Sequence, residues 1–111
     1  MALHHAAHGE IVDVRPLGKK LKQAISATLV KTDHLQVFRY ILPRGEEFAE
    51  HKVHGEIMVQ CLEGVIEFTS VGRKQTLRAG ELVYLAGDDP HALKGMEDAS
   101  VLVTIVSSRR T

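Results

Sequence analysis

Glycines recur at nearly even intervals through the second half of the chain. Gly64, Gly72, Gly80, Gly87 and Gly95 follow one another every seven or eight residues. The runs between them are short and rich in β-branched and aromatic residues. Short strands separated by turn residues at regular spacing are typical of an antiparallel sandwich or barrel. The spacing therefore predicts an all-β fold.

The apolar runs give the expected positions of the strands. They cover residues 34–42, 57–63, 65–71, 81–86 and 99–107, with a hairpin over 71–80 that turns near Gly72. The two runs that flank Gly64 are expected to form another hairpin. Glu46, Glu47 and Glu50 are interpreted as an acidic loop.

A short irregular or helical segment is expected near the start of the chain. Leu17, Leu21 and Ile25 recur at helical spacing, although Gly18 weakens a helix there. The alternative is a short turn followed by a strand over 26–32.

The length and the charge balance of the chain limit the classes of protein to which it can belong. The 111 residues are expected to form one domain, 1–111, with a flexible tail over 1–10. The 14 basic residues balance the 14 acidic ones, which argues against a nucleic-acid or membrane surface. No secretory signal or membrane-spanning segment is visible, and the single Cys61 is interpreted as a small core residue. A cytoplasmic location is the resulting expectation.

The run 57–63 is apolar on both faces of its predicted strand. One face carries Ile57, Val59 and Cys61, and the other carries Met58, Gln60 and Leu62. One face can fill a barrel interior, which leaves an apolar outer face. That outer face can meet a second sheet or a second copy of the chain, and on so small a protein we expect a homodimer.

Two segments combine this glycine spacing with histidines. In the first, five residues separate Gly45 from His51, and the segment closes on Gly64. In the second, Gly80 precedes His91 in "GELVYLAGDDPHALKG". Together these segments resemble the two motifs of the cupin family, which implies a small double-stranded β-helix (jelly-roll) barrel. The motif region spans residues 45–95.

The chain departs from the family pattern at several motif positions. Val53 and Ile57 stand where the second histidine and the glutamate are expected, while Ala86, Asp88 and Gly95 replace the proline, glycine and asparagine of the second motif. Only His51 and His91 match the usual metal ligands. His54 and Glu56 are each displaced by one position, which on a regular strand turns a side chain to the other face. A bulge near Gly55 could bring one of them back.

The resemblance leaves two kinds of site open. With His54 turned inward, His51, His54 and His91 would form a three-histidine site for a divalent transition metal, namely Zn, Ni, Fe or Cu. Without a metal, His51 and His91 would act as neutral imidazoles for acid–base catalysis, because an apolar pocket disfavours their charged form. In a non-catalytic binding or sensor module they would only orient a small-molecule ligand. Gln60 would join them if a bulge shifted its strand.

Other polar residues have simpler interpretations. His4, His5 and His8 are read as a solvated tail, and His34 as a turn residue. Tyr40 and Tyr84 are expected in the wall or the core. Arg39 interrupts an apolar strand, where it forms a surface salt bridge or reaches a ligand carboxylate, and the surface role is favoured.

Overall fold

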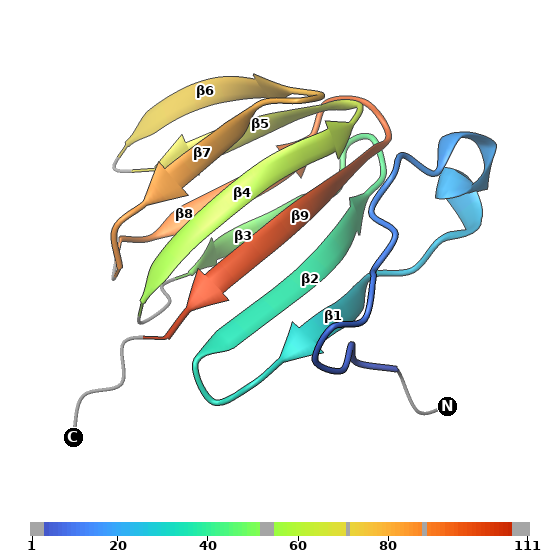
Figure 1. Cartoon of the computed structure of the whole chain (residues 1–111). Helices are drawn as coiled ribbons and strands as arrows, with labels where there is room; N and C mark the ends of the chain where they lie inside the picture. The colour runs from blue at the N-terminus through green and yellow to red at the C-terminus, as the bar shows by residue number, and fades with distance from the viewer. Residues whose placement is uncertain (1–3, 52–54, 71, 88, 108–111) are drawn as a thin grey trace.

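The computed structural model describes residues 4–51, 55–70, 72–87 and 89–107, with the backbone alone at 49–51 (Figure 1). These residues form a short 3₁₀ helix and nine strands. They are η1 (Gly18–Gln23), β1 (Ala27–Lys31), β2 (Leu35–Leu42), β3 (Glu47–His51), β4 (Glu56–Glu63), β5 (Val65–Ser70), β6 (Arg73–Arg78), β7 (Leu82–Leu85), β8 (His91–Gly95) and β9 (Ala99–Val106). The predicted all-β fold is confirmed.

The strands form two antiparallel sheets that lie face to face in Figure 1. The five-stranded sheet has the order β1-β2-β9-β4-β7, and the four-stranded sheet has the order β3-β8-β5-β6. The core between the sheets consists of apolar side chains from both: Leu42, Ile57, Val59, Cys61, Ile66, Phe68, Leu77, Leu85, Leu93, Ala99, Val101 and Val103. This is the sandwich-like barrel that the glycine spacing predicts.

The side chains of strand β4 alternate between the buried face and the outer face of the sheet. Ile57, Val59 and Cys61 are buried, whereas Met58 is exposed and Gln60 is half-buried. The predicted alternation and the core position of Cys61 are therefore confirmed. Across the sheet, Met58 lies opposite Tyr84 of β7. The outer face of this sheet carries the exposed apolar residues Met58, Leu82, Tyr84 and Val106.

The turn at Gly64 differs from the prediction. Strand β4 pairs with β7 and β9, whereas β5 pairs with β6 and β8, so the chain changes sheet at Gly64. Gly64 has a φ of +79°, and a Cβ there would lie 2.2 Å from the backbone oxygen of Asp98. The predicted hairpin across Gly64 is thus wrong, because this glycine makes a corner between sheets. The hairpin at Gly72, between β5 and β6, is confirmed.

The acidic stretch around Glu47 is a strand rather than a loop. β3 lies at the edge of the four-stranded sheet, where it pairs with β8. Phe48 lies opposite Leu93 and packs against the core, while Glu47 is exposed. An edge strand that is half solvated tolerates charged residues, and this explains why its polarity resembled that of a loop.

The segment before β1 is attached to the barrel. In the 3₁₀ helix η1, Ala24 N donates to Leu21 O over 3.1 Å, and Leu21 is buried. The carboxylate of Glu63, at the end of β4, accepts hydrogen bonds from the backbone N–H groups of Leu17 and Gly18. The expected short helical segment is therefore present. No helix in the part of the chain that the structure describes is long and apolar enough to span a membrane.

Candidate functional site

His91 begins strand β8 and points into the barrel. The preceding Pro90 lacks a backbone N–H and is suited to the position before a strand. In β8, His91, Leu93 and Gly95 are buried and alternate with more exposed residues. The exposed fraction of His91 is only 3%, so its imidazole is a polar group in the barrel interior.

A narrow cavity adjoins this imidazole. Its volume is about 20 Å³, close to the space that one water molecule needs. Both sheets contribute to its wall, which consists of Phe38, Tyr40, Phe48, Ile57, Val59, His91, Leu93, Val103 and Ile105. His91 and the hydroxyl of Tyr40 are the polar side-chain groups among these residues. The cavity is therefore an apolar space with few polar groups, as small-molecule sites generally are.

Three of the four half-buried side chains in the cavity wall are aromatic. Phe38, Tyr40 and Phe48 are half-buried, whereas Ile57 and Val59 are buried. The ring centroids of Phe38 and Tyr40 lie 5.0 Å apart, and those of Tyr40 and Phe48 lie 4.6 Å apart. Burial raises the pKa of Tyr40, so its hydroxyl stays neutral at physiological pH. The predicted wall position of Tyr40 is confirmed.

The His91 imidazole is held by contacts on two sides. Its ring stacks near Phe68, with centroids 6.4 Å apart and planes inclined by 24°. Its Nδ1 atom lies 3.4 Å from the backbone oxygen of Asp89. In the tautomer that carries a proton on Nδ1, this is a long N–H···O hydrogen bond. These contacts fix the plane of the ring within the barrel.

His51 ends strand β3, and its backbone pairs with that of His91. The antiparallel register places position 51 directly opposite position 91, after an irregularity between Phe48 and His51. The register thus brings together two positions that lie forty residues apart in the sequence. The side chain of His51 and all of His54 lie outside the described residues. The catalytic and metal-binding roles assigned to these histidines therefore stay predictions.

Comparison with known proteins identifies the family. The family model for the cupin domain matches residues 38–107 of this chain, and these residues include both histidine segments. The chain belongs to the cupin family. A comparison with curated proteins finds no match.

Solved cupin structures share this fold. A conserved protein of unknown function from Streptococcus pyogenes is 24% identical over 99% of this chain and 97% of its own, with a TM-score of 0.77. A cupin superfamily protein from Desulfitobacterium hafniense is 19% identical over 93% of this chain and 100% of its own, with a TM-score of 0.77. KdgF from Halomonas sp. is 20% identical over 76% of this chain and 78% of its own, with a TM-score of 0.69. At these identities the likeness concerns the fold.

Glu56 and Gln60 of this cupin lie away from the interior cavity. The pairing of β4 with β9 is regular from Glu56 to Cys61. Glu56 is exposed, and Gln60 lies opposite Leu82 and Leu102 on the outer face. No bulge in this stretch turns either side chain toward His91, so the option that Gln60 joins the pocket is wrong. Tyr84, expected in the wall or the core, is 55% exposed on the outer face.

The described residues do not fit a metal centre. No group of three His, Cys, Asp or Glu side chains is placed to hold a metal ion within the part of the cupin that the structure describes. At the interior cavity the described wall offers one imidazole, whereas a catalytic zinc site generally takes three protein ligands. The three-histidine hypothesis depends on the side chains of His51 and His54 and stays a prediction.

Proposed function

We propose that this cupin binds a small, largely apolar molecule inside the barrel, with His91 as its main polar contact. The supporting observation is a buried imidazole at a cavity whose other described wall residues are almost all apolar. A polar ligand group that enters such a space needs a hydrogen-bond partner. In the tautomer that carries its proton on Nε2 rather than Nδ1, the His91 imidazole donates to a carbonyl or carboxylate on an otherwise apolar molecule.

The size of the cavity sets how a ligand enters. A space of about 20 Å³ does not admit an organic molecule without movement of the wall. Phe38, Tyr40, Phe48 and Ile105 are the half-buried residues of the wall, and three of them are aromatic. Rotation of these rings would enlarge the cavity while the buried Ile57 and Val59 stay in place. Binding is therefore proposed to be coupled to rearrangement of the aromatic rings.

The same geometry suits acid–base chemistry. A neutral imidazole carries one donor and one acceptor nitrogen, so His91 can donate a proton to, or accept one from, a bound molecule. The acid–base catalysis expected from the sequence needs a group of this kind. A binding or sensor module needs the same group only to orient its ligand. Binding is common to both alternatives and is the function that the geometry supports best.

A titration with a neutral carbonyl compound tests the binding proposal. Cyclohexanone is added to ¹⁵N-labelled protein, and the amide shifts of β8 and β2 are followed by NMR. We expect these amides to shift in the wild type and in His34→Leu, which replaces an exposed histidine. In His91→Leu and in His91→Gln the affinity should fall by about tenfold. Equal affinities in all four proteins would overturn the proposal.

Turnover separates the enzyme from the binding module. Small molecules released from the purified protein on denaturation can be identified by mass spectrometry and added back to the wild type and to His91→Gln. Conversion by the wild type but not by His91→Gln would support acid–base catalysis. Tight binding without conversion would support the sensor module.

A further inference from the structure

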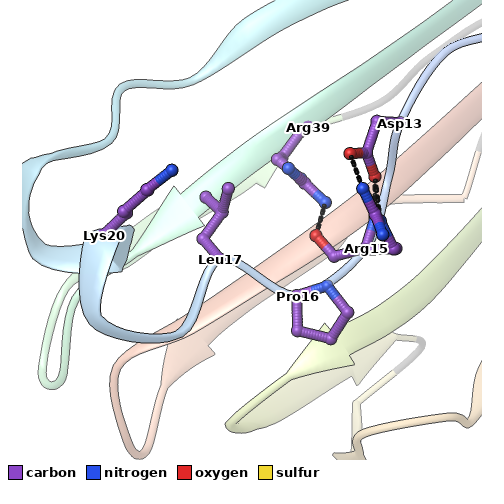
Figure 2. Close-up of a pocket in the computed structure, with 6 residues that line it drawn as sticks. All are labelled: Asp13, Arg15, Pro16, Leu17, Lys20 and Arg39. Carbon is purple, nitrogen blue, oxygen red and sulfur yellow. Dashed lines mark hydrogen bonds and ion pairs between the residues drawn. The ribbon is translucent and has the colours of Figure 1, made fainter.

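A second cavity lies outside the barrel, beneath the segment that precedes β1. It measures about 350 Å³ and is lined by Asp13, Arg15, Pro16, Leu17, Lys20 and Arg39 (Figure 2). Arg39 comes from β2, where the inward-facing neighbours Phe38 and Tyr40 line the interior cavity instead. The two cavities are therefore on opposite faces of the same sheet. At this size, the outer cavity is large enough for a small organic molecule.

Arg39 is an unusual residue for this position. It lies opposite Ala27 of β1 and Leu102 of β9, so its sheet neighbours are apolar. Its Nη2 atom donates to the backbone oxygen of Arg15 over 2.7 Å, as Figure 2 shows. It forms no ion pair with any described residue, so the surface salt bridge favoured from the sequence has no partner in that part of the chain. A guanidinium among apolar residues is costly unless its donors are satisfied.

One donor of Arg39 has no protein partner in the described part of the chain. Its Nε atom is buried and has no hydrogen-bond partner there. Buried donors are almost always paired, so an unpaired one needs an explanation. The guanidinium also lines the adjoining cavity, so a shift of this side chain would let an acceptor on a ligand there complete its hydrogen bonding.

The charges around the cavity favour an anion. Arg15, Lys20 and Arg39 contribute three cations, against the single carboxylate of Asp13. Asp13 is already engaged by Arg15, since their side chains form two hydrogen bonds of 3.0 and 2.8 Å. Lys20 forms no ion pair with any described residue. Lys20 and Arg39 are thus the cations that remain available, and in Figure 2 they lie on either side of Leu17.

The position of the cavity wall is fixed by the body of the barrel. The backbone N–H groups of Leu17 and Gly18 both donate to Glu63, and this carboxylate also accepts a bond from the buried Ser100. Glu63 is therefore already satisfied by the protein and does not neutralise Arg39 through an ion pair. Leu17 and Pro16 supply an apolar surface next to the two cations.

We propose that this outer cavity binds a small organic carboxylate. The carboxylate accepts from the Arg39 guanidinium and from the Lys20 ammonium, and the apolar part of the molecule packs against Leu17 and Pro16. A guanidinium paired with a carboxylate makes a strong charge-assisted hydrogen bond. The apolar wall favours an organic anion over inorganic phosphate. The site is separate from His91 and does not depend on the function proposed for the barrel interior.

An NMR titration at constant ionic strength tests this proposal. Sodium benzoate is the probe, and the neutral benzamide and inorganic phosphate are compared with it. We expect benzoate to shift the amides of Leu17, Gly18 and Lys20, whereas benzamide and phosphate leave them in place. The substitution Lys20→Gln should weaken benzoate binding by about tenfold. Lys19→Gln is the matched control, because it removes an equal charge from the same helix but not from the cavity wall.

The possible results either support or overturn this site. If Lys19→Gln and Lys20→Gln weaken benzoate binding equally, the effect is one of general charge. If benzamide shifts the same amides as much as benzoate does, the carboxylate is not recognised. Either result overturns the proposal. Binding of phosphate alone would overturn the organic class of ligand. Arg39→Gln should also weaken benzoate binding, but it removes the hydrogen bond to Arg15 O and can prevent folding. If Arg39→Gln does not fold, Lys20→Gln decides the test. Benzoate binding should persist in His91→Leu, which keeps this test independent of the barrel interior.

Discussion

The hydroxyl of the buried Ser100 donates a 2.7 Å hydrogen bond to the carboxylate of Glu63, and this contact connects β9 with the end of β4. The same carboxylate accepts from Leu17 N over 2.9 Å and from Gly18 N over 3.1 Å. One acidic side chain therefore joins the barrel to the segment before β1. That segment also forms a wall of the outer cavity, so its attachment matters for both stability and binding.

Replacement of Glu63 by glutamine is expected to destabilise the fold. Glu63→Gln keeps the shape of the side chain but removes the charge that strengthens three hydrogen bonds, and its NH₂ group cannot accept from a backbone N–H. We expect the free energy of unfolding in urea to fall by about 1–3 kcal/mol. Glu67→Gln is the control, because Glu67 lies on β5 away from this contact. A loss of equal size in both variants would contradict the structural role of Glu63.

The stability of the protein should depend on pH through Glu63. Burial alone would raise the pKa of this carboxyl, but the hydrogen bonds from Leu17, Ser100 and Gly18, together with the charge of Arg39, lower it from 4.5. A carboxyl whose pKa is lower in the folded state stabilises the fold above its unfolded pKa, and this stability is lost as pH falls through the folded pKa. We expect the unfolding free energy of Glu63→Gln to fall less steeply below about pH 4.5 than that of the wild type. Parallel curves from urea unfolding would contradict this.

Gly64 should be far less tolerant of substitution than Gly72. Both have a positive φ, but a Cβ at Gly64 would lie 2.2 Å from Asp98 O, whereas nothing lies within 4 Å at Gly72. Gly64→Ala combines backbone strain with a backbone clash and should cost about 3 kcal/mol or more. Gly72→Ala has the strain alone and should cost about 1–2 kcal/mol. Urea unfolding of both variants measures the difference, and similar losses would argue against a close corner at Gly64.

The fold could be predicted because its signals are local. The regular glycines, the apolar runs and the alternation along β4 each depend on a few neighbouring residues, and the structure confirms them. The partner of a strand is not a local property. The sequence around Gly64 is compatible with a hairpin, and only packing of Ala99 and Asp98 against this turn makes it a corner between sheets.

The candidate site was predictable in part for the same reason. His91 lies after a proline at a strand start and within a glycine frame, and these signals correctly placed it inside the barrel. Its pairing with His51 arises because β3 and β8 are neighbours, a relationship that the acidic composition of β3 concealed. The environment of Arg39 was equally hidden, since its hydrogen-bond partner Arg15 lies in another part of the chain.

Metal analysis tests whether His51, His54 and His91 form a three-histidine site. The described wall of the interior cavity supplies one imidazole, His91, and a stable site generally needs further ligands, which His51 and His54 would supply. The measurement uses tag-free protein in which His4, His5 and His8 are replaced by alanine, so that the start of the chain cannot bind metal. One equivalent of Zn, Ni, Fe or Cu that is lost in His91→Ala is the result expected of that site. Less than one equivalent in the wild type would contradict it.

The protein is expected to form a homodimer through the outer face of its five-stranded sheet. Met58 and Tyr84 lie opposite each other there, and Leu82 and Val106 extend the exposed apolar surface. The equal numbers of acidic and basic residues mean that two copies carry no net charge that would repel. Sedimentation should therefore give twice the 12.3 kDa mass of one chain.

A matched pair of methionines tests which surface forms this dimer. Met58 and Met96 are 43% and 44% exposed, but Met96 follows β8 and lies outside the apolar face. In an isologous dimer each substitution occurs twice, so Met58→Lys buries two charges in an apolar interface and should give a monomer. Met96→Lys adds the same charge at a solvated position and should leave the dimer intact. Dissociation by both variants, or by Met96→Lys alone, would place the interface on another surface.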